Sequence, residues 1–219
     1  MVLTAEMRWF WPEKCPPDLE HWFFHSTPKA GGGLPRQDAY VRQLNGSELG
    51  VKRRGSNAGF ELKGLVAILR DSELAALVPH GELWCKWYSN DLPLDPAAFV
   101  TIQKVRWIRK LDTSGPAIAE VPLGPDEAPL DGRSRREGCN LTLTKVQIVG
   151  VAGQWWTFCF EASGDVESAP NNLRSATQYV RSVGFPKVSG DFLSYPSWLA
   201  EVANAETELP NLTRSRATL

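Results

Sequence analysis

The chain has 219 residues and a formal net charge of −1, with 24 Lys and Arg against 25 Asp and Glu. This length allows a sizeable core within one domain, and the balanced charge excludes the global cationic excess typical of nucleic-acid binders. No apolar run reaches membrane-spanning length, and the four cysteines form no Cys-x-x-Cys pair. Residues 1–6 lack the basic and apolar regions of a signal peptide, so we expect a soluble, reducing, cytoplasmic setting.

Strand-like runs dominate the chain. Most carry β-branched or aromatic residues and are bounded by Gly, Pro, Asn or Ser, which is typical of strands. The predicted strands cover residues 4–11, 37–44, 48–54, 59–67, 82–89, 99–111, 117–122, 139–148 and 154–162. Helices are predicted at 17–24 and 71–77, and most clearly at 171–183, where apolar residues recur at helical spacing.

The remaining segments read as connections. The run Gly31-Gly32-Gly33 lacks the Lys-Ser/Thr of a phosphate-binding P-loop, so it predicts a flexible connector. Residues 123–138, rich in Pro, Gly and alternating charge, predict a mobile loop, and the chain beyond Glu206 predicts a disordered tail. We therefore expect a mostly β fold in one domain over residues 1–205, with a few peripheral helices.

Residues 48–63 are the most informative stretch. Lys52 and Arg54 on one predicted strand, and Glu61 and Lys63 on the next, recur with period two. Successive residues of a strand point to opposite faces, so these charges share a face. The opposite face carries apolar residues: Leu49, Val51, Phe60 and Leu62. If the sheet curls, the charges converge into a site for a multiply charged anion.

The same alternation, with charged residues on one face of the strand, recurs on other predicted strands. The sets that share a face are Glu6 and Arg8; Asp38, Tyr40 and Arg42; Glu82, Trp84, Lys86 and Tyr88; Lys104, Arg106 and Lys110; and Trp155, Thr157, Cys159 and Glu161. For any single strand, a solvated outer face is the simpler interpretation. Recurrence over several strands weakens that interpretation, because an outer face normally mixes both signs with small polar residues.

Short motifs follow one another along these strands: Asp38-x-Tyr40, Lys52-Arg53-Arg54, Glu61-x-Lys63, Lys104-x-Arg106 and the segment 156–164 with Glu161. In this order they resemble the CYTH, or triphosphate tunnel metalloenzyme, superfamily. Its members are antiparallel barrels with a lumen of Lys, Arg and Glu, and include inorganic triphosphatases, thiamine-triphosphatases and class IV adenylyl cyclases.

The resemblance implies roles for individual residues. Phosphate binding would fall to the cations Arg8, Lys52, Arg54, Lys63, Lys86, Lys104 and Arg106. Glu6, Glu61 and Glu161 would hold Mg²⁺ or Mn²⁺, and Glu6 and Glu161 would be catalytic. The implied partner is a small phosphorylated anion, with no nucleic acid and no membrane.

The sequence departs from the family pattern where the metal should bind. The signature Glu-x-Glu-x-Lys is represented by Glu6-Met7-Arg8-Trp9-Phe10, and Thr142 and Thr144 stand where acidic groups are usual. Arg8 would repel a metal and pair with Glu6, whereas phosphate binding needs only the cations. We therefore expect a binder of phosphate-rich anions, with a metal-dependent triphosphatase as the alternative. A third reading is an interaction protein whose charges form internal salt bridges.

Two further segments give weaker predictions. His21 and His25, four residues apart, have a spacing that can ligate a metal, although a partly exposed helical pair is the simpler interpretation. Residues 194–199 predict an apolar plug in which Tyr195, Trp198 and Leu199 close the barrel.

Overall fold

The computed structural model describes residues 2–42, 48–55, 59–70, 74, 77–78, 80–90, 92, 94–95, 98–133 and 137–202. The strands are β1 (Val2–Pro12), β2 (Gly31–Val41), β3 (Leu49–Arg54), β4 (Phe60–Leu69), β5 (Gly81–Ser89), β6 (Phe99–Asp112), β7 (Ala119–Val121), β8 (Gly138–Ile148), β9 (Trp155–Gly164) and β10 (Asp191–Phe192). The helices are α1 (Pro17–Phe24) and α2 (Ser168–Ser182), and residues 195–202 are also helical.

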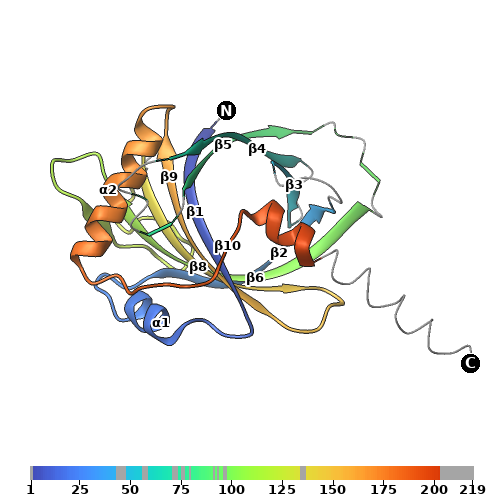
Figure 1. The fold of residues 1–219 in the computed structure, drawn as a ribbon, viewed down its shortest axis with the longest axis horizontal. Coiled ribbons are helices and arrows are strands. Elements are labelled where there is room, and N and C mark those ends of the chain that lie inside the picture. Colours follow the sequence, from blue (N-terminus) through green and yellow to red (C-terminus); the bar gives the residue numbers. More distant parts are fainter. Residues whose placement is uncertain are drawn as a thin grey trace, which may run out of the picture.

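Eight of these strands form a closed antiparallel barrel, in the order β1-β5-β4-β3-β2-β6-β8-β9 (Figure 1). The ring closes because β1 pairs along nearly its whole length with β9, from Leu3 opposite Gly164 to Pro12 opposite Trp155. The short strands β7 and β10 add to β6 and β1 at the margins. Closure removes the free sheet edges and gives every strand an inner and an outer face.

The largest hydrophobic core lies outside the barrel wall rather than inside it. Outward-facing side chains of β1, β8 and β9, such as Trp9, Leu143 and Phe158, are fully or almost fully buried. They are covered by α1, α2 and the segment that follows α2, as Figure 1 shows at the left of the barrel. With its apolar faces buried outward, the barrel can keep polar and charged side chains in its interior.

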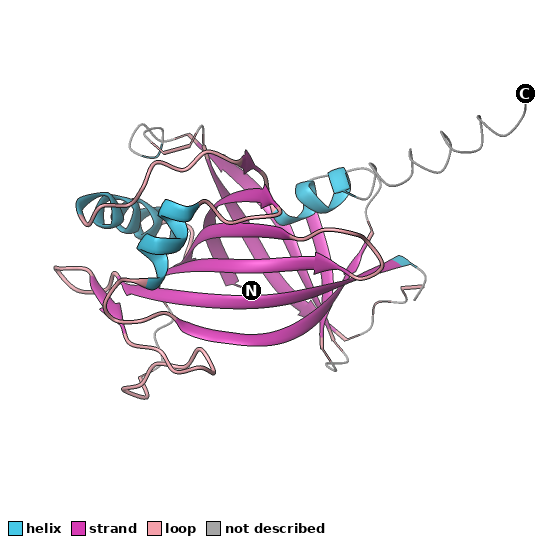
Figure 2. Cartoon of the chain, turned by 90° about the horizontal axis from the view of Figure 1, so that it is seen from below, coloured by secondary structure: helices cyan, strands magenta, loops and turns pink. Residues whose placement is uncertain are grey.

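One end of the interior is apolar and closed. Phe10 and Ile102 lie there on β1 and β6, and the helical residues 195–202 pack onto them. The Trp198 ring stacks on Phe10 with centroids 4.8 Å apart, and Tyr195 stacks on Tyr40 at 4.9 Å. Figure 2 shows this short helix at one end of the strands. The predicted plug is therefore present.

The nine predicted strands are all present, but the strand that begins at Gly31 corrects one expectation. The glycine run is not a flexible connector: it is the start of β2, where Gly32 pairs with Trp107 before a register shift at Pro35. A Cβ on Gly32 would lie 2.5 Å from the Arg106 carbonyl oxygen, and its φ is +99°. Only glycine lets β2 approach β6 so closely.

The other element predictions have mixed outcomes. The helix at 17–24 is confirmed, and the helix predicted at 171–183 begins three residues earlier, at Ser168. The two-residue strand β10 was not predicted. The helix predicted at 71–77 lies mostly outside the described residues, as does the tail beyond Glu206. Among the helices that the described ranges contain, none has the length and apolarity needed to cross a membrane.

Candidate functional site

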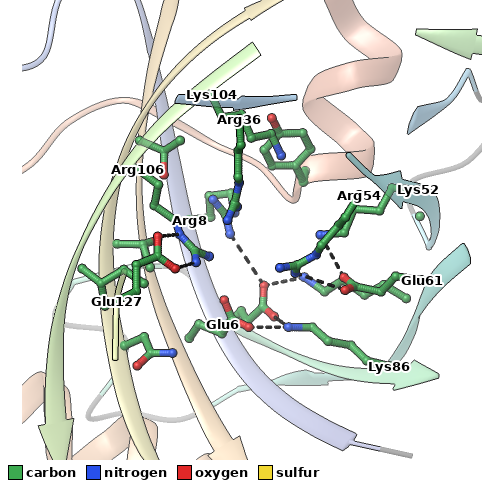
Figure 3. A pocket seen from close by; sticks show the side chains of 18 of the residues that line it. Glu6, Arg8, Arg36, Lys52, Arg54, Glu61, Lys86, Lys104, Arg106 and Glu127 are labelled. Carbon is green, nitrogen blue, oxygen red and sulfur yellow. Dashed lines mark hydrogen bonds and ion pairs between the residues drawn. The ribbon is translucent and has the colours of Figure 1, made fainter. Parts of the chain in front are cut away.

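The interior beside the plug is a cavity of about 290 Å³ lined by charged side chains (Figure 3). Every residue for which the sequence predicts a phosphate-binding or metal-binding role lines it: Glu6, Arg8, Lys52, Arg54, Glu61, Lys63, Lys86, Lys104, Arg106 and Glu161. They come from β1, β3, β4, β5, β6 and β9, so only closure of the barrel brings them together. Their inward placement follows the parity of each strand, while their roles stay predictions.

The first cluster of charges surrounds Glu6, which is 2% exposed on β1. Lys63 Nζ donates to Glu6 Oε2 at 2.5 Å, Thr4 Oγ1 donates to Oε1 at 2.7 Å, and Lys86 Nζ lies 3.6 Å from Oε1. Burial by itself raises the pKa of Glu6, but Lys63 and Lys86 outweigh it and hold the pKa below its ordinary value. Glu6 is therefore a charged carboxylate already shared between two ammonium groups.

Glu161 on β9 belongs to the same cluster. It accepts a hydrogen bond from Lys86 Nζ, so that Lys86 bridges the carboxylates of β1 and β9. Burial opposes ionisation of Glu161, yet Lys86 and Lys63 lower its pKa below the ordinary range. The same carboxylates raise the pKa of Lys86 against the effect of its own burial. All three groups stay ionised at neutral pH.

A second cluster surrounds Glu61 on β4. Lys52 Nζ lies 2.9 Å from Glu61 Oε1, Arg54 Nη2 lies 3.1 Å from Oε2, and the Tyr88 hydroxyl donates to Oε2 at 3.3 Å. Burial of Lys52 and the neighbouring Arg54 charge lower the pKa of Lys52 to about 8, although Glu61 opposes this shift. One carboxylate thus faces two cations, and positive charge remains.

Lys104 is almost fully buried at the border between the plug and the charged interior. Its Nζ donates to Asp38 Oδ2 at 3.0 Å and to the Tyr40 hydroxyl at 2.5 Å, and lies over the Tyr40 and Tyr195 rings at 4.5 and 4.2 Å. Burial lowers the pKa of Lys104 well below its ordinary value despite the opposing Asp38 charge. Lys104 therefore ties the plug to the barrel wall, and its ammonium group is already paired with Asp38.

Three arginines form the least neutralised wall, and a loop carboxylate faces one of them. Arg8 Nη1 donates to Thr157 Oγ1 at 3.2 Å, and Arg8 Nη2 lies 4.0 Å from Glu6. Arg106 is held bidentately by Glu127 from the loop after β7. Arg36 on β2 has a buried Nε without a hydrogen-bond partner in the described chain. Burial and the Arg106 charge lower the pKa of Arg36.

Cations outnumber carboxylates in this cavity. Among the described residues, nine Lys and Arg line it: Arg8, Arg36, Lys52, Arg54, Lys63, Lys86, Lys104, Arg106 and Lys110. Four carboxylates line it, Glu6, Glu61, Glu127 and Glu161, and Asp38 adds a fifth through Lys104. The excess of positive charge lies mainly on the side of the arginines, in a space of low effective dielectric where attraction to an anion is strong.

The carboxylates are not arranged as a metal site. The described residues contain no group of three or more His, Cys, Asp or Glu side chains that could hold a metal ion. Glu6 and Glu161 share Lys86, while Glu61 pairs with Lys52 and Arg54. Ammonium and guanidinium groups thus occupy the oxygens that a hard cation requires. As arranged, the donor set does not fit Mg²⁺ or Mn²⁺, and the metal roles of Glu6, Glu61 and Glu161 stay predictions.

Several lining residues were not predicted as site residues. Arg36 has the same parity as Asp38, but the strand was expected to begin at residue 37. Lys110 continues the face of Lys104 and Arg106, so parity alone could have added it. Glu127 lies in a segment that we expected to be a mobile loop, where no periodic pattern marks a side chain as inward.

The paired histidines lie apart from this cavity. The His21 and His25 rings stack 4.1 Å apart near the end of α1, and His25 Nδ1 contacts the His21 carbonyl oxygen. Both residues are exposed. This geometry matches the simpler reading of a surface helical pair.

Comparison with known proteins assigns no family to the chain. No protein-family model matches the chain, and no curated protein matches it. Among solved structures, the chain is similar to a conserved hypothetical protein from Pyrococcus furiosus, with 11% identity and a TM-score of 0.42 over 88% of this chain and 98% of that one. At that identity and score, neither a family nor a function follows.

Proposed function

We propose that this protein binds a phosphate-rich anion, such as a triphosphate, a short polyphosphate or an organic phosphate, inside its barrel and without a metal. The observation that carries the proposal is that nine Lys and Arg side chains line the cavity, whereas only four carboxylates of the described residues do. Arginine offers paired donors to phosphate oxygens and lysine offers a point charge, so both suit a ligand with several phosphoryl groups. The resemblance to the triphosphate tunnel superfamily supports the same ligand class.

The ligand would enter from the end opposite the plug. Residues 195–202 and Phe10 fill the other end, and the arginines Arg8, Arg36 and Arg106 line the cavity between the strands. Thr142 and Thr144 on β8 line the cavity beside them and can donate hydrogen bonds to phosphate oxygens. In this proposal the other cations attract the anion while they remain paired with their carboxylates; they are Lys52, Arg54, Lys63 and Lys86.

A metal-dependent triphosphatase is the second candidate, favoured by the presence of Glu6 and Glu161 around one ammonium group. If Lys86 and Lys63 both turned toward the ligand, Glu6 and Glu161 would be free to take a divalent cation. Arg8 opposes this, because its guanidinium lies only 4.0 Å from Glu6. Release of inorganic phosphate from triphosphates with Mg²⁺ or Mn²⁺ present distinguishes the two candidates, and we expect little or none.

Thermal unfolding with and without tripolyphosphate tests binding directly. A ligand that binds only the folded state raises apparent stability, by about 2.7 kcal/mol at one hundred times the dissociation constant. We expect a rise in Tm at millimolar tripolyphosphate that shrinks with added salt because the attraction is screened. Arg54→Glu should remove most of the shift, whereas Arg42→Glu, an exposed position that does not line the cavity, should retain it. An unchanged Tm for the wild-type protein would refute the proposal.

A further inference from the structure

Among the described carboxylates that line the cavity, Glu127 differs from the others in the kind of segment that carries it. Glu6, Glu61 and Glu161 project from the barrel strands β1, β4 and β9, whereas Glu127 projects from the connection between β7 and β8. Its side chain reaches into the cavity and meets Arg106, as Figure 3 shows. A carboxylate on a connection can move away without any change in the barrel wall.

The turn that carries Glu127 is well defined. The Gly124 amide donates to Ala128 O at 2.8 Å, the Glu127 amide donates to Gly124 O at 3.0 Å, and the Ala128 amide donates to Asp126 Oδ1 at 3.1 Å. The Gly32 amide of β2 donates to Gly124 O at 3.3 Å, which anchors the turn to the barrel. The position of Glu127 in the cavity is therefore specified by the turn.

The backbone at Glu127 is in the left-handed region, with φ of 66°. Residues with a Cβ rarely adopt this conformation, and glycine or asparagine is the usual choice there. A glutamate held in such a conformation is a common sign of a side chain placed for a functional reason. Here the conformation aims the carboxylate at the guanidinium group of Arg106.

The contact that Glu127 makes is the contact that a phosphate would make. Its two oxygens accept from Arg106 Nε, at 2.8 Å, and from Nη2, which is the paired geometry arginine uses for carboxylate and phosphate alike. Arg36 stands beside Arg106, with its buried Nε unpartnered among the described residues. Two of the five N–H donors of Arg106, those on its Nε and Nη2 edge, are thus occupied by a side chain of the protein.

We propose that Glu127 is an internal ligand of Arg106 that the bound anion displaces. The inference rests on the proposed function and names its regulation: Glu127 competes with the anion for one arginine. An anion with several phosphoryl groups gains enough contacts with Arg8, Arg36 and Arg106 to replace the carboxylate, whereas orthophosphate gains few. Glu127 therefore lowers the affinity for every anion that must displace it from Arg106.

Titration calorimetry with tripolyphosphate and with orthophosphate tests this, using wild type and Glu127→Gln. We expect Glu127→Gln to bind tripolyphosphate about tenfold tighter or more, as the loss of one competing charge-assisted pair implies. Orthophosphate bound at Arg106 should gain by about the same factor, because it displaces the same carboxylate. Glu127→Gly, which removes the carboxylate and suits a φ of 66°, should show the same gain. The control Glu137→Gln removes an exposed carboxylate that does not line the cavity, and should bind as wild type does.

A double-mutant cycle with Arg106→Gln separates displacement from a general change in charge. Without Arg106 there is no pair to break, so the gain from Glu127→Gln should disappear in that background. A gain that persists there would overturn the inference, and so would equal affinities of wild type and Glu127→Gln. In both of these cases binding by the wild-type protein would leave the proposed function standing. If neither wild type nor any variant binds tripolyphosphate, the proposed function and the inference both fail.

Discussion

Replacement of Glu6 by glutamine should destabilise the protein and at the same time strengthen anion binding. Glu6 is 2% exposed and neutralises Lys63 at 2.5 Å and Lys86 at 3.6 Å. Removing one partner of a buried ion pair costs about 3–5 kcal/mol, because the other partner stays buried and uncompensated. For a domain of this size, each kcal/mol lowers Tm by about 2–4 °C, so Glu6→Gln should lower Tm by about 6–20 °C.

Tripolyphosphate should reverse much of this loss, because the anion supplies the negative charge that the variant lacks. The matched control is Glu120→Gln, which breaks the equally buried Glu120–Arg109 pair outside the cavity, where Arg109 lies over the Trp22 ring. The assay is scanning calorimetry with and without millimolar tripolyphosphate. Glu6→Gln should show a larger ligand-induced rise in Tm than wild type, while Glu120→Gln should show the wild-type rise. Equal rises in the two variants would refute the reasoning.

Two further predictions concern protons and metals. Because burial and Arg54 lower the pKa of Lys52 to about 8, an anion beside Lys52 should raise that pKa, and binding at pH 8 should take up protons. Calorimetry in buffers of different ionisation enthalpy measures the uptake, which should be smaller at pH 6 and in Lys52→Met. Between pH 8 and the ordinary lysine pKa, the Lys52 side chain binds more protons in the unfolded chain than in the folded one. Its contribution to the free energy of unfolding therefore rises with pH over this range, and the rise should be lost in Lys52→Met. Arg8→Glu should make Tm respond to Mn²⁺, because a second carboxylate then lies close enough to Glu6 for both to ligate one divalent cation. An equal Mn²⁺ response in the wild-type protein would contradict the assigned effect of Arg8.

The signature of the superfamily that the sequence resembles cannot be introduced at both positions, for a reason that the sequence alone does not show. Phe10 looks like a simple replacement of the signature lysine, and Phe10→Lys together with Arg8→Glu would be the obvious reversal. In the structure Phe10 is 1% exposed and stacks on Trp198 within the plug. An ammonium group at position 10 would be buried without a partner, so Arg8→Glu alone is the informative change.

The strands and the inward faces could be predicted because both follow from local chemistry. Alternation of charged and apolar residues specifies the face of each residue, and a one-residue error would have moved Lys104 and Arg106 to the outside. The pairing of distant strands adds what local patterns lack. The glycines 31–33 have no strand propensity, but the long strand β6 offers them partners, and that extension brings Arg36 into the cavity.

The position of Glu127 shows the limit of such reasoning. A loop has no period, so nothing in the residues 123–138 separates an inward glutamate from an exposed one. The turn is anchored to the barrel by one backbone hydrogen bond, donated by the Gly32 amide, and Gly32 belongs to a strand far back in the chain. Tertiary contacts of this kind decide which loop charges join a site, and a single sequence does not contain them.

The pairing of β1 also governs how the barrel can assemble. β1 ends at Pro12, yet its partners β5 and β9 begin only at Gly81 and Trp155. Until β9 forms, one edge of β1 has no partner and the Trp9 face lacks its cover, and such edges recruit other chains. Folding dominated by pairings this distant is slow, on the order of milliseconds to seconds. During synthesis the nascent chain must therefore keep β1 from aggregating while residues 13–154 are made, and we expect fragments that end before Trp155 to aggregate.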